Sequence, residues 1–297
     1  MTLTLVILLA IALVALYVAT DKRHKRLRRR LARAERREME ILHAIKPLYV
    51  SNAERRLADR GAEPRMPIEF RSQFGEDILL DALFDGQTDG FFIEVGAYDG
   101  YTYAVTYALE SQGWSGLLIE PVPSLHAKAQ ARRPGARVVN TALSRKGSTG
   151  TARFTHILGD GADGYDASSY LEDPGARGFS KRPPKTNVEH VEVPLTTMDD
   201  LLADHTGSVD VVVIDVEGGE LALLDGFDLE RFTPRVILIE DHNLGSDTAI
   251  LSHLTGRGYI HVCWLSYNRL MIHKDETDLI ARAHQVSQHT ATAKTAG

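Results

Sequence analysis

The sequence contains very little cysteine, with Cys263 as the only one among 297 residues. A disulfide scaffold is therefore excluded, and so is a zinc site built from several thiolates. Cys263 lies in the apolar run YIHVCWL, where a buried free thiol is the expected state rather than a metal ligand or a redox group.

Positive charge is also missing from most of the chain. The net charge is −6, but residues 21–37 alone hold ten Lys/Arg against two acids, a net of +8. Residues 1–20 carry no charged side chain, so residues 38–297 together carry −14. A main domain this acidic would repel the phosphates of DNA or RNA. We therefore predict no nucleic-acid partner.

A long apolar run is present only at the N-terminus. Residues 1–20, TLTLVILLAIALVALYVAT after the initiator, are long enough to cross a bilayer at about 1.5 Å per residue. A cleaved signal peptide is disfavoured because the basic residues follow the apolar run instead of preceding it. The positive-inside rule then predicts a single-pass membrane protein with a transmembrane helix at 1–20 and its main domain on the cytoplasmic side.

The remaining chain is predicted to fall into three parts. Residues 21–67 form a basic juxtamembrane helix, which lies against anionic headgroups and ends near Pro47, and then a linker. Residues 68–284 form the main domain, and residues 285–297 are a disordered tail.

Short apolar runs alternate with helical patterns throughout the main domain, as in a doubly wound, mostly parallel α/β sheet. Most of these runs end at or next to a polar side chain, as parallel strands do where ligands collect at their carboxyl ends. Two final runs separated by SYN indicate a terminal hairpin and hence an antiparallel edge. The predicted strands lie in residues 90–95, 116–120, 136–140, 209–216 and 235–240, and the hairpin lies in GYIHVCWL and RLMIHK.

The first strand runs into an acidic, glycine-containing turn, FFIEVGAYDG, in which Glu94 precedes Gly96 and Gly100. An ordinary strand-to-helix turn is one interpretation. A dinucleotide site is disfavoured because the pattern G-x-G-x-x-G is missing and a carboxylate would repel a pyrophosphate. The turn suits a ligand with an ammonium group or hydroxyls. Glu120, at the end of the second strand, has the position from which a carboxylate accepts both hydrogens of a ribose diol.

Seven sequence blocks, in this order, resemble the FkbM-type S-adenosylmethionine-dependent methyltransferases over about residues 70–275. The blocks are SQFGED (72–77), FFIEVGAYDG (91–100), LESQGWSGLLIEPVP (109–123), VVNTALS (138–144), TTMDDLL (196–202), VVVIDVEGGELALLDGF (211–227) and RVILIEDH (235–242). The resemblance implies a seven-stranded, Rossmann-like methyltransferase sheet. It also implies transfer of a methyl group from S-adenosylmethionine, usually to a hydroxyl of a sugar or another secondary metabolite.

The resemblance also assigns the cofactor site by position. Glu94, Gly96 and Gly100 would shape the methionine end, and Glu120 would hold the ribose. Asn140 and Ala142 would lie beside the adenine. Tyr98 stands where family members often have a different turn, so the rim of the site is left open.

The acceptor side is predicted from two further strand ends. Asp215 ends one strand, closely followed by Glu217, and the next strand ends in Glu240 with His242 two residues later. We rank Asp215 first as the base or orienting group, with Glu217 and His242 as further catalytic candidates. For His242 an ordinary loop histidine is the alternative. So many acids could also hold Mg²⁺ or Ca²⁺, but a divalent metal is not required and no metal site is assigned.

The acceptor itself is predicted only by class, as a small molecule, a glycan or a lipid-linked precursor. The Gly, Asp and Ser-rich insertion at 146–193 is expected to be a substrate-binding lid, in which Ser168, Ser169 and Tyr170 contact an acceptor sugar or are simply solvated. A membrane-tethered, non-catalytic binding protein and a nucleotide-dependent oxidoreductase are the alternatives. The sequence does not specify an oligomeric state.

Overall fold

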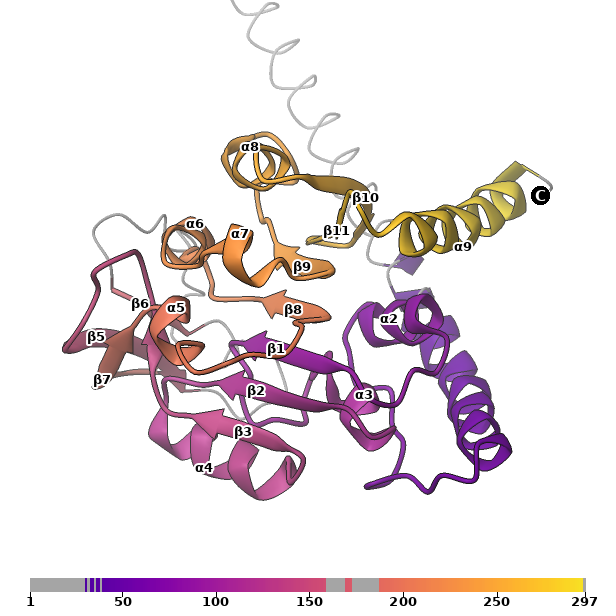
Figure 1. Cartoon of the computed structure of the whole chain (residues 1–297), viewed down its shortest axis with the longest axis horizontal. Coiled ribbons are helices and arrows are strands. Elements are labelled where there is room, and N and C mark those ends of the chain that lie inside the picture. Colours follow the sequence, from indigo (N-terminus) through magenta and orange to yellow (C-terminus); the bar gives the residue numbers. More distant parts are fainter. Residues whose placement is uncertain are drawn as a thin grey trace, which may run out of the picture. The chain divides into compact units, whose positions relative to one another are not determined.

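A computed structural model (Figure 1) describes residues 30, 33–34, 36–37, 39–158, 169–172 and 187–295, with side chains up to residue 286. The chain divides into two units, Met1–Leu48 and Tyr49–Gly297. In the first unit residues 39–48 are helical, so Pro47 does not end a helix as predicted.

The predicted membrane localisation is wrong for the part of the chain that the structure describes. None of the helices in that part is both long and apolar enough to cross a bilayer. Residues 1–20, on which the prediction of a transmembrane helix rested, lie outside the described residues.

The second unit begins with a helical segment where the sequence predicted a linker. Residues 49–59 are helical, and Ala53 and Leu57 are buried. Arg56 forms an ion pair with Asp81 at 2.6 Å. Burial of this apolar face stabilises the helix, and composition alone did not reveal it.

A seven-stranded sheet forms the centre of the second unit (Figure 1). Its order is β10-β11-β9-β8-β1-β2-β3, in which β11 is antiparallel to β9 and β10 and the other neighbours are parallel. This confirms the predicted doubly wound sheet with an antiparallel edge. The strands are β1 (Phe91–Val95), β2 (Ser115–Ile119), β3 (Ala136–Val139), β8 (Val211–Ile214), β9 (Val236–Glu240), β10 (Tyr259–Leu265) and β11 (Asn268–His273).

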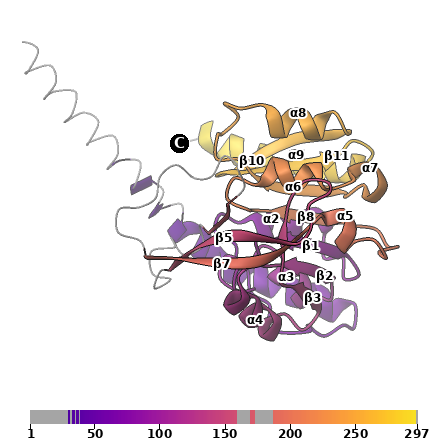
Figure 2. The ribbon, with the colours of Figure 1, turned by 90° about the vertical axis from the view of Figure 1, so that its left-hand side faces the viewer.

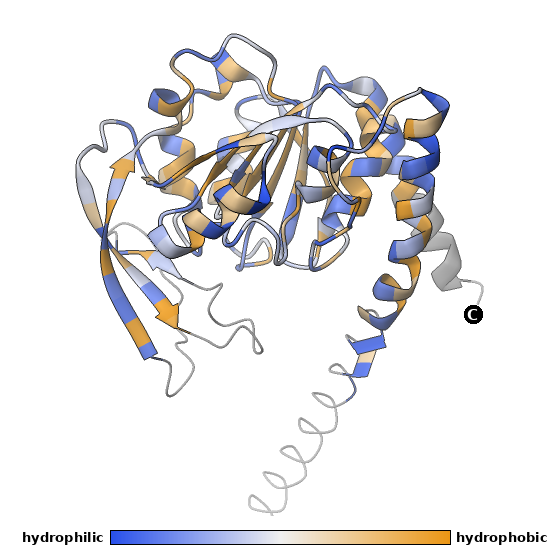
Figure 3. Cartoon of the chain, turned by 90° about the horizontal axis from the view of Figure 1, so that it is seen from below, coloured by the Kyte–Doolittle hydropathy of each residue, from blue (hydrophilic) through white to orange (hydrophobic). Residues whose placement is uncertain are grey.

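Helices cover both faces of this sheet because its central strands are apolar on both sides. Side chains alternate across a strand, so Ile93 and Val95 join one apolar cluster while Phe92 joins another. Figure 3 shows the hydrophobic residues gathered along these strands. The first cluster includes residues of α5 (Met198–Leu201), α6 (Glu220–Asp225), α7 (Leu229–Phe232) and α8 (Ala249–Thr255), and the second includes residues of α2 (Glu76–Phe84), α3 (Tyr107–Ser111) and α9 (Thr277–Thr295).

The last helix also corrects the predicted tail. α9 continues to Thr295, whereas disorder was predicted for 285–297. Leu279 and Ala283, in the first half of α9, are buried on the second cluster, and this packing stabilises the helix that the later residues continue.

The insertion between β3 and β8 builds a second, smaller sheet. Its order is β4-β7-β5-β6, and β5 and β7 form a long antiparallel pair that Figure 2 shows side by side. Most of residues 159–186, including Ser168, lie outside the described residues. The strands are β4 (Ala142–Leu143), β5 (Thr151–Leu158), β6 (Tyr170–Leu171) and β7 (Asn187–Thr196).

The order of the large sheet determines where a ligand can bind. The chain leaves β1 toward β2 on one side, and β8 pairs with β1 on the other side. Strand order therefore reverses between β1 and β8, and in such sheets ligands bind outside the carboxyl ends of the strands at this reversal. The four acidic strand ends singled out from the sequence, at β1, β2, β8 and β9, all lie at that edge because these strands are parallel.

Candidate active site

The turn after β1 is fixed from beneath by Glu94. This side chain is only 5% exposed. Its carboxylate accepts hydrogen bonds from the backbone N–H groups of Val105 at 2.8 Å and Thr106 at 3.3 Å, and from the Thr106 hydroxyl. Glu94 thus holds the loop at residues 96–106 in place, so it can shape a ligand site without presenting an open carboxylate.

Both glycines of this turn have left-handed backbone conformations, with φ of 82° at Gly96 and 74° at Gly100. A Cβ atom at Gly96 would overlap the backbone oxygen of Asp215, and one at Gly100 would lie 2.8 Å from the Cα of Ala129. Only glycine permits these approaches without strain. Gly96 therefore brings the β1 turn directly against the end of β8.

Glu120 occupies the predicted position at the end of β2. Its two carboxylate oxygens accept from the backbone N–H groups of Val122 at 2.8 Å and Tyr98 at 2.9 Å. Burial, partly opposed by these two hydrogen bonds, raises the pKa of Glu120 to about 8. Each oxygen of a carboxylate can accept more than one hydrogen bond, so Glu120 retains the capacity to accept from a diol.

The two residues assigned to the adenine lie next to Glu120 but differ in character. The side-chain amide of Asn140 donates to the backbone oxygens of Glu120 at 2.9 Å and Pro121 at 2.7 Å, so it fixes the turn after β2. Ala142 is buried in an apolar cluster that also contains Val122 and Phe154.

Sequence analysis missed two residues that support the same loop. Asp99 accepts from the N–H groups of Tyr101 at 3.0 Å and Thr102 at 2.7 Å. Burial favours the neutral form, but these bonds and the guanidinium of Arg132 outweigh it and lower the pKa of Asp99. An aspartate before glycine is a known turn signal, so the Asp99–Gly100 pair could have indicated this role.

Arg133 is the second missed residue, and it is only 1% exposed. Its guanidinium bonds Glu110 at 2.5 Å, the Thr106 hydroxyl at 2.8 Å and the Gly100 oxygen at 3.3 Å. It also lies 3.6 Å from the carboxylate of Glu94. Nothing in the surrounding sequence, ARRPGA, distinguishes this buried arginine from an exposed one.

The ends of β8 and β9 are neighbours, as predicted, because Ile214 pairs with Ile239 in parallel register. Asp215 follows directly, remains accessible to solvent and donates its backbone N–H to Val95 at 3.1 Å. Desolvation by the surrounding protein atoms raises the pKa of the Asp215 carboxyl. The negative charges of Glu240 and Glu217 raise this pKa further.

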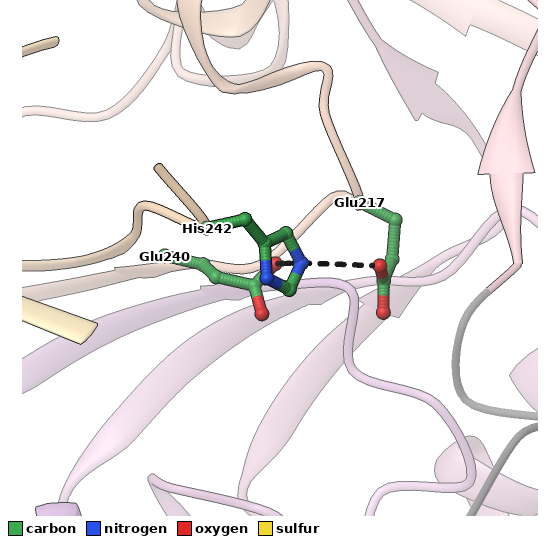
Figure 4. A group of neighbouring side chains, drawn as sticks. All are labelled: Glu217, Glu240 and His242. Carbon is green, nitrogen blue, oxygen red and sulfur yellow. Dashed lines mark hydrogen bonds and ion pairs between the residues drawn. The ribbon is translucent and has the colours of Figure 1, made fainter. Parts of the chain in front are cut away.

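His242 lies between two of these acids, and Figure 4 shows the three side chains converging. Its Nε2 is 3.4 Å from Glu217 Oε2 and 2.9 Å from Glu240 Oε2. Burial lowers the pKa of His242, but contact with both carboxylates outweighs burial and raises it to about 10. In this state His242 is an imidazolium at neutral pH and cannot accept a proton, so its predicted use as a base requires a change of partners.

The other acids of this edge support the turns. Glu220 accepts from the N–H groups of Gly218 at 3.0 Å and Val216 at 3.3 Å. Asp241 is buried and bonds Arg269 at 2.7 Å. These contacts fix the turns that carry Glu217 and His242 and direct Asp241 away from them.

The family of the chain is shown by comparison with known protein families. Residues 94–260 match the methyltransferase FkbM domain, and this match covers more than half of the sequence. The chain belongs to this family, and S-adenosylmethionine is its cofactor. The buried acceptor at Glu120 and the glycine turn after β1 are compatible with a ligand of this kind.

Several solved methyltransferase structures are similar in fold. A TehB-like S-adenosylmethionine-dependent methyltransferase from Corynebacterium glutamicum has 16% identity and a TM-score of 0.36, over 77% of this chain and 99% of its own. Fibrillarin from Aeropyrum pernix with bound S-adenosyl-L-methionine has 12% identity and a TM-score of 0.33, over 67% and 75%. No curated protein sequence matches significantly.

Proposed function

We propose that this methyltransferase methylates a hydroxyl oxygen of a sugar or another small metabolite. The observation that carries the proposal is the contact between the β1 turn and the end of β8, where Gly96 lies against the backbone of Asp215. The cofactor turn and a solvent-accessible carboxylate therefore share one edge of the sheet. When bound, S-adenosylmethionine supplies a methyl group on a positively charged sulfur.

On the cofactor side, the chain provides a preorganised loop. Glu94, Gly96 and Gly100 shape the region for the methionine end, and Glu120 accepts from the ribose hydroxyls. Asn140 holds the turn beside the adenine, and Ala142 offers an apolar contact. Holding the reacting groups near contact supplies much of the acceleration expected of such an enzyme.

On the acceptor side, the hydroxyl must lose its proton as the oxygen becomes the nucleophile. Asp215 takes this proton, because it is a solvent-accessible carboxylate whose backbone lies against the β1 turn. Glu217 and His242 orient the acceptor. The small sheet borders this region, since Tyr98 of the cofactor turn packs against the cluster that contains Phe154 and Val193. We propose that the insertion at 146–193 contributes the acceptor contacts.

The test is methyl transfer by Asp215→Asn. Full-length protein is incubated with S-adenosylmethionine carrying a labelled methyl group and with fractionated glycans and small metabolites, and products are identified by mass spectrometry. Asp215→Asn should lower turnover by roughly 10²–10⁴-fold while binding the cofactor normally. Glu230→Gln, which removes an exposed charge on α7, is the matched control. Full turnover by Asp215→Asn would remove Asp215 from the proposed role.

A further inference from the structure

We propose that Glu217, Glu240 and His242 form a binding site for a first-row divalent metal ion. Each of the three side chains offers one ligand atom, and these atoms all lie within 4.8 Å of one another. They come from the ends of two adjacent strands, β8 and β9, and converge on one point (Figure 4).

The separations between the ligand atoms fit coordination of a single ion. Metal bonds to imidazole nitrogen and carboxylate oxygen are about 2.0–2.2 Å long, so ligands at neighbouring positions around one ion lie roughly 2.9–3.5 Å apart. His242 Nε2 is 2.9 Å from Glu240 Oε2 and 3.4 Å from Glu217 Oε2. An ion could therefore be bound after only small rotations of these side chains.

A second observation points to a ligand independently of the cluster itself. Glu240 is only 8% exposed, and its Oε2 atom has no hydrogen-bond partner among the residues that the structure describes. The same oxygen lies 2.9 Å from His242 Nε2, which is an ion-pair contact. A metal ion that replaces the proton of His242 would lie between the same two carboxylates and would compensate this buried oxygen in place of the imidazolium.

The backbone supports the same arrangement. Glu217 has a left-handed conformation with φ of 52°, which is strained for a residue with a side chain. Glu220 holds this turn through the N–H groups of Val216 and Gly218. Such supporting contacts fix the direction of metal ligands in known sites.

The ligand set indicates the kind of ion. One imidazole with two carboxylates suits Mn²⁺, Fe²⁺, Co²⁺ or Zn²⁺ better than Ca²⁺ or Mg²⁺, which prefer oxygen ligands throughout. Three protein ligands leave coordination positions for water or an acceptor. A cation there would polarise the acceptor hydroxyl and help it lose its proton. This role, unlike the site itself, rests on the proposed methyl transfer to oxygen.

Mn²⁺ binding to the full chain tests the inference. The protein is stripped with EDTA and titrated with Mn²⁺, and free ion is followed by electron paramagnetic resonance. We expect one Mn²⁺ per chain and at least tenfold weaker binding by both Glu240→Gln and Glu217→Gln. Glu230→Gln should bind Mn²⁺ as the parent does. Cofactor binding by calorimetry confirms that each variant is folded.

The possible failures are distinguishable. If the parent binds no Mn²⁺, or if folded Glu240→Gln and Glu217→Gln both bind it as tightly as the parent, the metal site is disproved, even where methyl transfer is intact. If Mn²⁺ binds as expected but no methyl group reaches a hydroxyl, the metal site stands and the proposed function fails.

Discussion

Three carboxylates position the loop after β1, and each accepts backbone N–H groups from it. Glu94 binds Val105 and Thr106, Asp99 binds Tyr101 and Thr102, and Glu120 binds Tyr98. These side chains organise the cofactor turn before any ligand is bound. At the scale of single residues, the site is therefore preorganised, which lowers the cost of binding.

The proposed ribose contact predicts a loss of cofactor affinity in Glu120→Ala. At pH 9, above the pKa of Glu120 of about 8, the carboxylate is ionised and the change removes two charge-assisted hydrogen bonds of about 1.5–3 kcal/mol each. Water entering the space restores part of this, so we expect binding to weaken by roughly thirty- to two-hundredfold, or about 2–3 kcal/mol. Calorimetry with S-adenosylmethionine measures the effect. Asp215→Asn should stay within about threefold of the parent, and unchanged binding by Glu120→Ala would refute the assignment.

The raised pKa of Glu120 predicts a pH-dependent cost to stability. Between its ordinary pKa of 4.5 and its folded pKa of about 8, the folded chain keeps a proton that the unfolded chain releases. The contribution of Glu120 to the free energy of unfolding therefore falls as the pH rises from 4.5 to about 8. Glu120→Gln replaces the carboxyl by a neutral amide, so the variant does not lose stability from burying a charge at high pH.

Thermal unfolding at two pH values measures this effect. We expect the Tm of Glu120→Gln, relative to the parent, to be higher at pH 9 than at pH 5 by roughly 8–16 °C. Any hydrogen-bond loss common to both pH values cancels in this comparison. Parallel Tm profiles for the two proteins across this range would show that Glu120 ionises normally.

The residues of the site differ in how readily sequence reveals them. Glu120 and Gly96 were predictable because a strand end and a glycine turn fix their surroundings. Asp99 could have been found from the turn that it begins. Arg133 could not, since its burial depends on α4 (Pro123–Arg132) bringing it over Glu110, which is remote in sequence.

At the scale of elements, Arg133 connects the end of α4 to α3 and to the loop after β1. It bonds Glu110 of α3 and the backbone of Gly100 in the loop. A buried ion pair of this kind fixes the relative positions of its elements, and removal of one partner leaves the other charge buried without compensation.

We therefore predict that Arg133→Met lowers the free energy of unfolding by about 3–5 kcal/mol. Urea unfolding of the variant and the parent measures the difference. Arg137→Met, which replaces an exposed arginine on β3, should change stability by at most about 0.5 kcal/mol. Equal stability of the two variants would mean that the Arg133 network is not needed for folding.

The strands were predictable and several helices were not. The runs of Val, Ile and Leu in β1, β2, β8 and β9 are buried on both faces, and every predicted strand is present at its place in the sheet. The segment 49–59 depends on packing against distant residues, such as Asp81 for Arg56, and the first half of α9 depends on the apolar cluster that buries Leu279 and Ala283. The composition of these segments is typical of a linker and of a tail. It contains no information on contacts with distant residues, so the helices were not predicted.

At the scale of the whole molecule, the chain combines a large seven-stranded sheet with a smaller sheet built by the insertion between β3 and β8. The FkbM domain match spans 94–260 and so includes the small sheet. The predicted family and cofactor are shown, whereas the predicted membrane localisation is wrong for the described residues. The membrane prediction used only the charge and the apolar length of one segment. The family prediction used several sequence blocks in a fixed order, and these blocks lie at the strand ends that form the site.

Identification of the methylated atom tests the central claim most directly. The full-length protein is incubated with S-adenosylmethionine carrying a ¹³C-labelled methyl group and with fractionated glycans and small metabolites, and the product is examined by NMR. The account predicts a labelled carbon with the chemical shift of an O-methyl group, coupled to the carbon framework of a sugar or a similar acceptor. A labelled N-methyl group as the sole product, or no transfer to any fraction by a protein that binds the cofactor, would contradict it.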